Sequence, residues 1–168
     1  MIVPIFGSPG CGKTTLGNAL TKKLGYPFFE LSWMPEFKIL NGKKISYKHE
    51  EKIAIHALLN VAKTYCEHGH EVVLISDFRF DSFDFVIQNI GLSSPVIKLI
   101  ASDENVLRAR VLDDFRPSAY RNVDEALHLN RKILSKIFKN QLTIDVNKCT
   151  LATEINLVSN FITCLQKV

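Results

Sequence analysis

Residues 2–15 read IVPIFGSPGCGKTT, and this stretch decides the fold. Ile2–Phe6 is a short apolar run typical of a buried strand, and Gly7–Thr14 matches the pattern G-x-x-x-x-G-K-S/T. Leucines then recur at helical spacing as far as Gly25, a residue type that often ends a helix. The sequence therefore predicts a strand, a glycine-rich turn and a helix in succession, which is the context that a phosphate-binding loop requires.

The chemistry of such a loop depends on these residue types. Glycines let the backbone curl until successive N–H groups point at phosphate oxygens, and the helix N-terminus adds partial positive charge. We expect the Lys13 ammonium to reach the β- and γ-phosphates of a nucleotide and the Thr14 hydroxyl to ligate Mg²⁺. Thr15 is expected to support the loop or contact the α-phosphate, and for Cys11 an inert filler is favoured over a regulatory thiol. The residues predicted to bind the nucleotide here are Gly7, Ser8, Pro9, Gly10, Cys11, Gly12, Lys13, Thr14 and Thr15.

Beyond the loop, short apolar segments alternate with longer amphipathic ones. Strands are predicted at 2–6, 28–31, 72–75, 96–100 and 142–146, and helices at 14–24, 48–68, 84–89, 105–113, 124–139 and 153–165. In the second of these helices the apolar residues Ile53, Ala57, Val61 and Tyr65 recur every four positions. This alternation predicts a single α/β domain over residues 1–168 with the P-loop NTPase fold, in which helices cover both faces of a five-stranded parallel sheet.

The composition excludes several classes of protein. The chain has 168 residues, 46% of them apolar, which suffices for the core of one domain, and its formal net charge is only +4. Four cysteines are scattered without metal-site or disulfide spacing, and no apolar run reaches the ~18 residues of a membrane span. Residues 1–6 contain no basic side chain, so we expect no targeting leader. We therefore expect a cytoplasmic protein, a monomer or homodimer, that binds neither nucleic acid nor membrane.

A second acidic feature follows the apolar strand at 72–75. Asp77 stands just after this strand, the general position of a metal-associated acidic residue in folds that carry a phosphate-binding loop. The next residues are Phe78 and Arg79 and not a glutamate that could activate water. The pattern favours a phosphotransferase over a dedicated ATPase, with Thr14 and Asp77 as the expected metal ligands.

In element order the whole chain resembles the adenylate-kinase-like small P-loop kinases, which include nucleoside-monophosphate, shikimate and gluconate kinases. The loop is the one specific motif of the resemblance. Asp77-Phe78-Arg79 is similar to a shortened Asp-Gly-Phe-Pro-Arg segment of adenylate kinases, and more similar to the Asp-x-Arg of phosphomevalonate and deoxynucleotide kinases. The resemblance implies that Asp77 lies near Mg²⁺ or the acceptor and that Arg79 holds an acceptor phosphate. The alternative is a helix-capping Asp77 and a surface Arg79.

The same resemblance implies an acceptor-binding segment over about 32–68. In shikimate-type kinases the second strand ends in two alternating acidic residues, and Glu30 and Ser32 occupy these positions here, so only the first is acidic. Glu30 then serves the acceptor or is a solvated strand-end residue. The large side chains of this segment either stack on a base or simply pack, and they are Trp33, Met34, Phe37 and Tyr47.

Arginine is concentrated in one part of the chain, because five of the six arginines lie between residues 108 and 131. The planar guanidinium suits both the clasping of phosphate and stacking on a ring. Arg110…Arg116-Pro117 is similar to the lid of shikimate kinases. This similarity implies a mobile lid over about 113–123, with Arg110 beside adenine and Arg116 or Arg121 over the γ-phosphate.

Two further observations concern the helix after this segment. Arg131 shares helical spacing with Leu127, Leu134 and Phe138, so we expect it at the edge of an apolar stripe, with a bound phosphate or a structural carboxylate as its partner. Residues 108–148 carry nine basic and five acidic side chains, which accounts for the whole net charge of +4. We interpret this local excess as complementary to a nucleoside triphosphate.

These features together predict an ATP-dependent, Mg²⁺-requiring kinase that moves the γ-phosphoryl group of ATP to a small acceptor. A nucleotide or nucleoside acceptor is slightly preferred because of Asp77-x-Arg79. A small metabolite is the alternative acceptor. A regulatory nucleotide-binding module or an ATPase without a small-molecule acceptor is the alternative class.

The loop assignment can be tested by a single substitution. Lys13→Ala removes the charge expected to contact the β- and γ-phosphates, so the variant should lose the thermal stabilisation that nucleotide and Mg²⁺ give to the unsubstituted protein. Differential scanning fluorimetry measures this shift. An unchanged shift would refute the phosphate-loop assignment.

Overall fold

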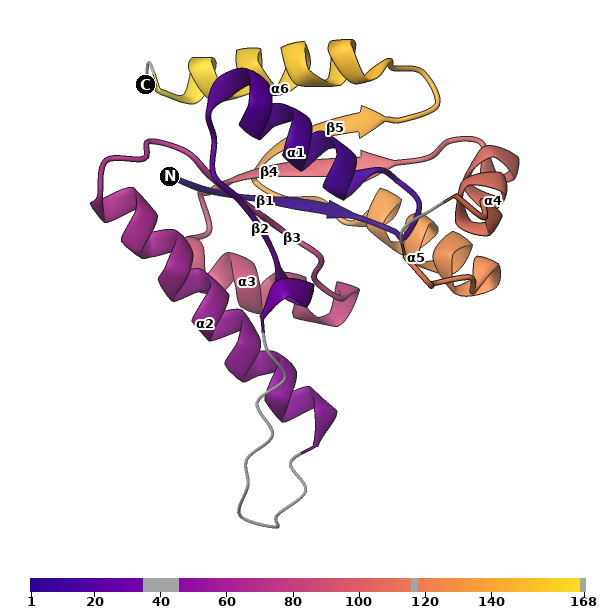
Figure 1. Cartoon of the computed structure of the whole chain (residues 1–168), viewed down its shortest axis with the longest axis horizontal. Coiled ribbons are helices and arrows are strands. Elements are labelled where there is room, and N and C mark those ends of the chain that lie inside the picture. The colour runs from indigo at the N-terminus through magenta and orange to yellow at the C-terminus, as the bar shows by residue number, and fades with distance from the viewer. Residues whose placement is uncertain (35–45, 116–117, 167–168) are drawn as a thin grey trace.

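The computed structural model describes residues 1–34, 46–115 and 118–166, and its centre is a parallel sheet of five strands (Figure 1). The strands lie in the order β2-β3-β1-β4-β5. Their bounds are Ile2–Gly7 for β1, Phe28–Glu30 for β2, Val73–Ser76 for β3, Pro95–Ile100 for β4 and Asn140–Asp145 for β5. The predicted fold class, α/β with the P-loop NTPase arrangement, is confirmed.

Helices connect the strands and form a layer on each face of the sheet. The longer ones are α1 (Lys13–Leu24), α2 (Tyr47–Glu67), α3 (Phe83–Ile90), α4 (Glu104–Leu112), α5 (Val123–Ser135) and α6 (Leu151–Gln166). A short 3₁₀ turn, η1 (Leu31–Trp33), follows β2, and a second one, η2 (Phe80–Ser82), precedes α3. In the described part of the chain, no helix is both long enough and apolar enough to cross a membrane.

Side-chain alternation along β1 divides the core into two clusters. Val3 and Ile5 face α1 and α6, whereas Phe6 faces α2 and α3. The Phe6 ring stacks on Phe83 with 3.8 Å between ring centroids. Because β1 is buried on both faces, its sequence is a continuous apolar run and not an alternating one.

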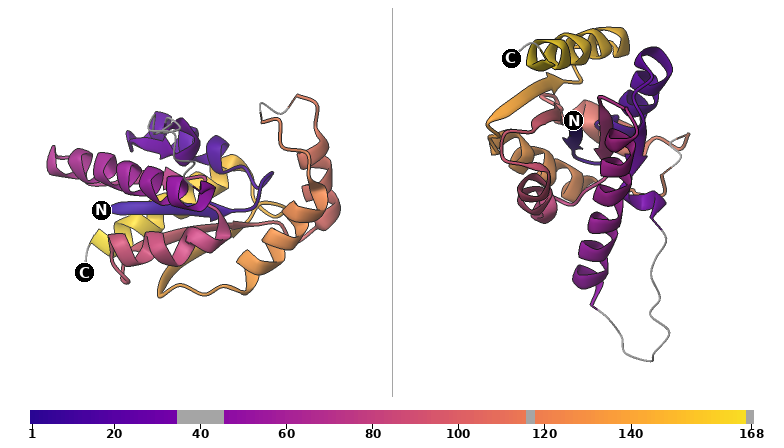
Figure 2. Two further views of the ribbon diagram at one scale, coloured as in Figure 1. Left: turned by 90° about the horizontal axis from the view of Figure 1, so that it is seen from below. Right: turned by 90° about the vertical axis from the view of Figure 1, so that its left-hand side faces the viewer.

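The strand order determines where polar groups gather. All five strands are parallel, so the segments that follow them leave the same edge of the sheet. β1 lies between β3 and β4; the connection from β1 to β2 runs to one side of it, and the connection from β3 to β4 crosses to the other side, which makes this edge a topological switch point. Figure 2 shows α4 standing beyond the carboxyl ends of the strands.

The side chains that α2 buries differ from the row of apolar residues that marks this helix in the sequence. Each step of four residues advances about 40° around a helix, so a row of such steps drifts off any one face. The buried side chains are instead Ile55, Leu58, Leu59 and Ala62. Tyr65, the last residue of the predicted row, is exposed.

The predicted helix over 124–139 is too long at its C-terminal end. α5 stops at Ser135, so Phe138 lies outside the helix and Leu134 is half exposed. The buried Lys98 ammonium donates to the carbonyl oxygens of Leu134 at 3.3 Å and Lys136 at 2.8 Å. Burial lowers the pKa of Lys98. A strand lysine therefore caps this helix end, which no local pattern in α5 could indicate.

The contact between α1 and β2 leads to a stability prediction. Gly17 faces the buried ring of Phe28, and a Cβ added at Gly17 would come within 2.5 Å of that ring. Gly17→Ala gains about 1 kcal/mol of helix propensity but overpacks the core by about 1–3 kcal/mol, so it should lower the free energy of unfolding. Urea denaturation measures the change.

Two controls accompany this variant. Lys22→Ala on the exposed side of the same helix should leave stability within about 0.5 kcal/mol. Phe28→Leu should relieve the clash, so the double variant should be more stable than the two single effects predict by addition. Additive effects would show that the two residues do not collide.

Candidate active site

The loop between β1 and α1 is shaped by its glycines. Gly10 and Gly12 have φ of +91° and +87°, a backbone conformation that other residues rarely adopt. A Cβ at Gly10 would also lie 3.0 Å from side-chain atoms of Leu107 and Val111, so α4 packs directly against the loop. The Lys13 ammonium donates to the carbonyl oxygens of Gly7 at 3.1 Å and Ser8 at 3.3 Å. The loop therefore has the compact curl that directs N–H groups toward an anion.

The first turn of α1 suits an anionic ligand. Its N-cap residue is Gly12, so no side chain caps the helix, and no acidic residue lies in the first turn. Uncapped N–H groups and the positive end of the helix dipole then point to the same place. Residues of the predicted loop set, among them Pro9, Gly10, Gly12, Thr14 and Thr15, line a cavity of about 1050 Å³ at this point.

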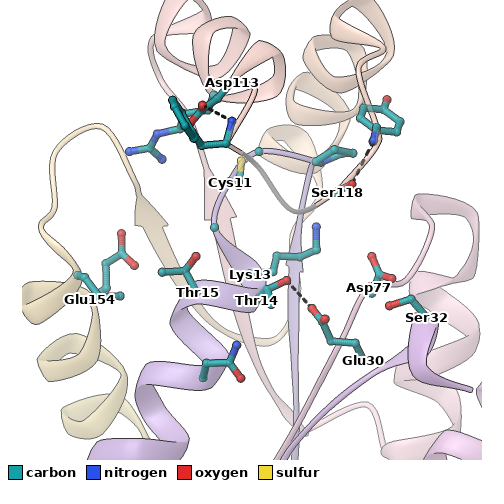
Figure 3. A pocket seen from close by; sticks show the side chains of 18 of the residues that line it. Cys11, Lys13, Thr14, Thr15, Glu30, Ser32, Asp77, Asp113, Ser118 and Glu154 are labelled. Atoms are coloured by element: carbon teal, nitrogen blue, oxygen red, sulfur yellow. Dashed lines mark hydrogen bonds between the residues drawn. The ribbon is translucent and has the colours of Figure 1, made fainter.

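A polar network connects three elements at the carboxyl edge of the sheet. The Thr14 hydroxyl donates to Glu30 Oε1 at 2.6 Å (Figure 3). The Ser76 hydroxyl donates to the same oxygen at 3.3 Å. Glu30 is only 7% exposed, so it is not a solvated strand-end residue. Asp77 and Ser32 line the same cavity nearby. Sequence reasoning missed Ser76, although its place at the end of β3 beside β2 was an available signal.

These oxygens fit Mg²⁺ in the manner of phosphate-binding loops. Among the described residues, no group of three or more His, Cys, Asp or Glu side chains could hold a metal ion alone. Mg²⁺ is usually bound through one or two carboxylates together with substrate phosphates and water, so a dedicated protein cage is not required. The Thr14 hydroxyl, the Glu30 carboxylate that receives its hydrogen bond and the Asp77 carboxylate supply such a donor set.

Asp77 has a strained backbone. Its φ is +73°, and among the described residues it is the one non-glycine with positive φ. Strain of this kind persists where the surrounding structure imposes it, and it concentrates at functional sites. The left-handed conformation of Asp77 turns the chain just after β3, and Asp77 lines the cavity.

Cys11 is a packing residue in this structure. It is 1% exposed, and its Sγ lies 3.2 Å from Ser8 Oγ and 3.9 Å from Asn130 Oδ1. Burial raises the pKa of the thiol, although the Ser8 hydroxyl and the Lys13 charge act in the opposite direction. Asn130 in turn pairs with both backbone groups of Ala101 at 2.8 and 3.0 Å. The loop is thereby fixed to β4 and α5.

Only some of the arginines predicted to belong to the site line a cavity in the described part of the chain. Arg110 lines the main cavity and donates to the Val146 carbonyl oxygen at 3.3 Å. Arg121 donates to the carbonyl oxygens of Ser118 and Tyr120, which belong to its own segment, and is not a lining residue. Arg116 lies outside the described residues. Arg79 lines a second cavity of about 330 Å³, which shares Lys13, Asp77 and Tyr120 with the first.

The structure places Arg131 on the surface and not at the edge of an apolar stripe. Its side chain is 62% exposed and forms two 2.6 Å hydrogen bonds to the Glu104 carboxylate. Of the two expected partners, the structural carboxylate is the one observed. The pKa of Glu104 is lowered by these hydrogen bonds and that of Arg131 is raised by them.

The end of the cavity near α6 holds a residue that sequence reasoning missed. Glu154 lies in the first turns of α6, is 8% exposed and lines the main cavity together with Thr15, Asn18 and Arg110. Burial raises the pKa of its carboxyl group, and the charge of Arg110 opposes this change. No local pattern in the sequence distinguishes this glutamate from an ordinary acidic residue in the first turn of a helix.

Comparisons with known proteins support the fold assignment. Residues 3–79, less than half of the chain, match the model for the ATPase family associated with various cellular activities (AAA). No curated protein matches the sequence. The matched region contains the phosphate-binding loop and Asp77, which are the parts of the site common to proteins of many different activities.

Solved structures resemble nearly the whole chain. The YorR protein from Bacillus subtilis in complex with phosphorylated GDP has a TM-score of 0.66 and 15% identity, covering 100% of this chain and 99% of that one. A gluconokinase from Sinorhizobium meliloti has 0.65 and 18%, covering 97% and 91%. A shikimate kinase from Aquifex aeolicus has 0.60 and 18%, covering 97% and 96%. At these identities the likeness establishes the fold, which is the P-loop fold that small kinases share.

The strain at Asp77 leads to a prediction about stability. Asp77→Gly relieves the positive φ, whereas Asp77→Ala keeps the strain and loses the tolerance of Asp for this conformation. The free energy of unfolding of the glycine variant should therefore be about 1 kcal/mol higher than that of the alanine variant. The same pair of substitutions at Asp81, which lies in η2, should show the reverse order. Urea denaturation of the four variants tests both, and a more stable Asp77→Ala would disprove the strain.

Proposed function

We propose that the protein is a kinase that transfers the γ-phosphoryl group of ATP to a small acceptor. One observation carries the proposal: the loop lysine, the Thr14–Glu30 hydrogen bond and the Asp77 carboxylate meet where two cavities join. The larger cavity has the volume for a nucleotide, and the smaller one has the volume for a small acceptor. Phosphoryl transfer needs positioning and charge neutralisation, and this junction offers both.

Each part of the site has a role in this proposal. Lys13 and the loop N–H groups bind the phosphates, and Thr14 is held in place by the Glu30 carboxylate. Mg²⁺ held there would neutralise charge that develops on the phosphate oxygens in the transition state. Because the Thr14 and Ser76 hydroxyls both donate to Glu30 Oε1, we assign Glu30 to the orientation of these two side chains.

The acceptor would occupy the smaller cavity beside Asp77 and Arg79, with Ser32 on the adjoining wall of the main cavity. Arg79 supplies a positive charge for an acceptor phosphate, and Phe80 supplies an aromatic surface in the same cavity. This combination supports a nucleotide or nucleoside acceptor slightly over a small metabolite. The names of two structural neighbours, a gluconokinase and a shikimate kinase, keep the metabolite alternative open.

The segment after α4 would cover the bound nucleotide. Phe115, Ser118 and Tyr120 line the main cavity, and Phe115 is 95% exposed. A segment that closes over the phosphates would exclude water and suppress hydrolysis. We retain 113–123 as the lid, 32–68 as the acceptor segment and the chain as one domain, a monomer or homodimer. The four free cysteines support a reducing compartment such as the cytoplasm.

A transfer assay with matched variants tests the kinase proposal. Purified protein is incubated with labelled ATP, Mg²⁺ and a panel of nucleotides, nucleosides, sugar acids and shikimate. We expect label on at least one acceptor and only slow hydrolysis without acceptor. Lys13→Ala and Asp77→Asn should each lower kcat by about 10² or more, since each removes a group that stabilises the transition state.

The alternatives predict different results in the same assay. Rapid hydrolysis without transfer would identify an ATPase. Tight nucleotide binding with neither transfer nor hydrolysis would identify a regulatory nucleotide-binding module. Arg131→Ala is the control, because Arg131 is paired with Glu104 away from both cavities and should leave kcat unchanged.

A further inference from the structure

We propose that Glu154 reads the nucleoside of the bound nucleotide by accepting a hydrogen bond from an N–H or O–H group of its base or sugar. The proposal rests on nucleotide binding at the phosphate loop, as in the proposed function, but not on phosphoryl transfer. Glu154 would thus be the residue that determines which nucleoside triphosphate the protein prefers.

The position of Glu154 follows from the direction of the cavity. One end of the cavity holds Ser32 and Asp77, where the γ-phosphate would meet the acceptor. The loop then leads to Thr15 at the start of α1, and the cavity continues to Asn18, Leu151 and Glu154. A triphosphate laid along the loop therefore directs its nucleoside toward α6. Figure 3 shows the Glu154 side chain on α6 near Thr15, at the end of the cavity away from Asp77.

The Glu154 carboxylate has no hydrogen-bond partner within residues 1–34, 46–115 and 118–166. The residue is 8% exposed, and the Arg110 charge acts on it without forming an ion pair within 4.0 Å. Its oxygens are not among the fully buried atoms of the described residues that lack a partner, so they reach the cavity, whereas burial of the rest of the residue raises the pKa of the carboxyl group and disfavours its charged form. A group that costs stability yet faces a cavity is more readily explained by a ligand than by the fold.

The chemistry of a carboxylate limits which groups of a ligand Glu154 can bind. An ionised carboxylate only accepts hydrogen bonds, so it repels phosphate and selects donors. A nucleoside offers donors in two places, which are the amino or ring N–H groups of the base and the hydroxyl groups of the sugar. Both sources share this chemistry. Arg110 on the same wall is suited to stack on a base ring or to neutralise phosphate, and so does not compete for the same group.

Binding measurements with altered nucleotides test the inference. Dissociation constants are measured by calorimetry for ATP, purine riboside triphosphate, 2′-deoxy-ATP and 3′-deoxy-ATP, and for the pair GTP and ITP. Purine riboside triphosphate and ITP each lack one amino group of the base, and the deoxynucleotides each lack one hydroxyl. A hydrogen bond to a charged group is worth about 1.5–3 kcal/mol, so wild type should bind one of these analogues about tenfold or more weakly than its parent.

Variants at position 154 separate reading from a structural role. In Glu154→Ala the analogue should bind within about twofold of its parent, because the acceptor is gone, and Glu154→Gln should be intermediate. If Glu154 only supports the fold, all nucleotides should weaken by the same factor and their ratios should stay as in wild type. That result, or a wild type that binds every analogue as tightly as its parent, would overturn the inference. The base arm and the sugar arm show which donor is read.

The controls distinguish this inference from the kinase proposal. Lys13→Ala should lose affinity for every nucleotide, whereas Glu67→Gln, an exposed carboxylate on α2, should change none. At neutral pH the free energy of unfolding of Glu154→Gln should be at least that of wild type, since the substitution removes a buried unpaired charge. If the protein binds nucleotide but transfers no phosphate, the kinase proposal fails. The ratios of analogue to parent dissociation constants then still test the role of Glu154. A wild type that binds no nucleotide would end both.

Discussion

The turn between β1 and α1 is the constraint on which the rest of the site depends. β1 is the central strand, so the turn emerges at the middle of the carboxyl edge, and positive φ at Gly10 and Gly12 lets it curl tightly onto α1. The side chains of α4 fill the space that a Cβ at Gly10 would need. Cys11 and Asn130 then tie the turn to β4 and α5. A ligand on this turn therefore touches a rigid surface, while the groups that choose among ligands come from neighbouring elements.

The charges around the main cavity follow a simple order. Positive groups and backbone N–H groups lie along the loop, with Lys13 at its centre, whereas carboxylates lie at both ends, with Asp77 and Glu30 at one and Glu154 at the other. A triphosphate is anionic in its middle and offers hydrogen-bond donors in its nucleoside. The acidic groups at the Asp77 end suit a divalent cation and an acceptor.

Sequence alone predicted the features that are local in the chain. The loop, the strand before it and the helix after it are specified by adjacent residues, so their positions needed no tertiary knowledge. Asp77 was identified because it follows an apolar strand. Ser76 and Glu154 were missed because their importance arises only when β2 and β3 pair or when α6 packs beside α1. The buried face of α2 and the end of α5 depended on packing against the sheet and on Lys98, neither of which periodicity can resolve.

The local excess of positive charge also could not be interpreted from the sequence alone, because the fold pairs some of these charges with acidic residues from elsewhere in the chain. Residues 108–148 hold the whole net charge, yet Arg131 pairs with Glu104 and Lys136 pairs with Asp84, and both acids lie outside that stretch. Lys148 pairs with Asp145 inside it. The pairs with Glu104 and Asp84 therefore offset part of the excess within the fold, by holding α4 to α5 and α3 to the end of α5. Of the arginines described in this stretch, Arg110 is the one that lines the main cavity. A single guanidinium, beside a carboxylate that has no partner among the described residues, is too little for a general anion-binding surface, but it suffices to stack on one aromatic ring.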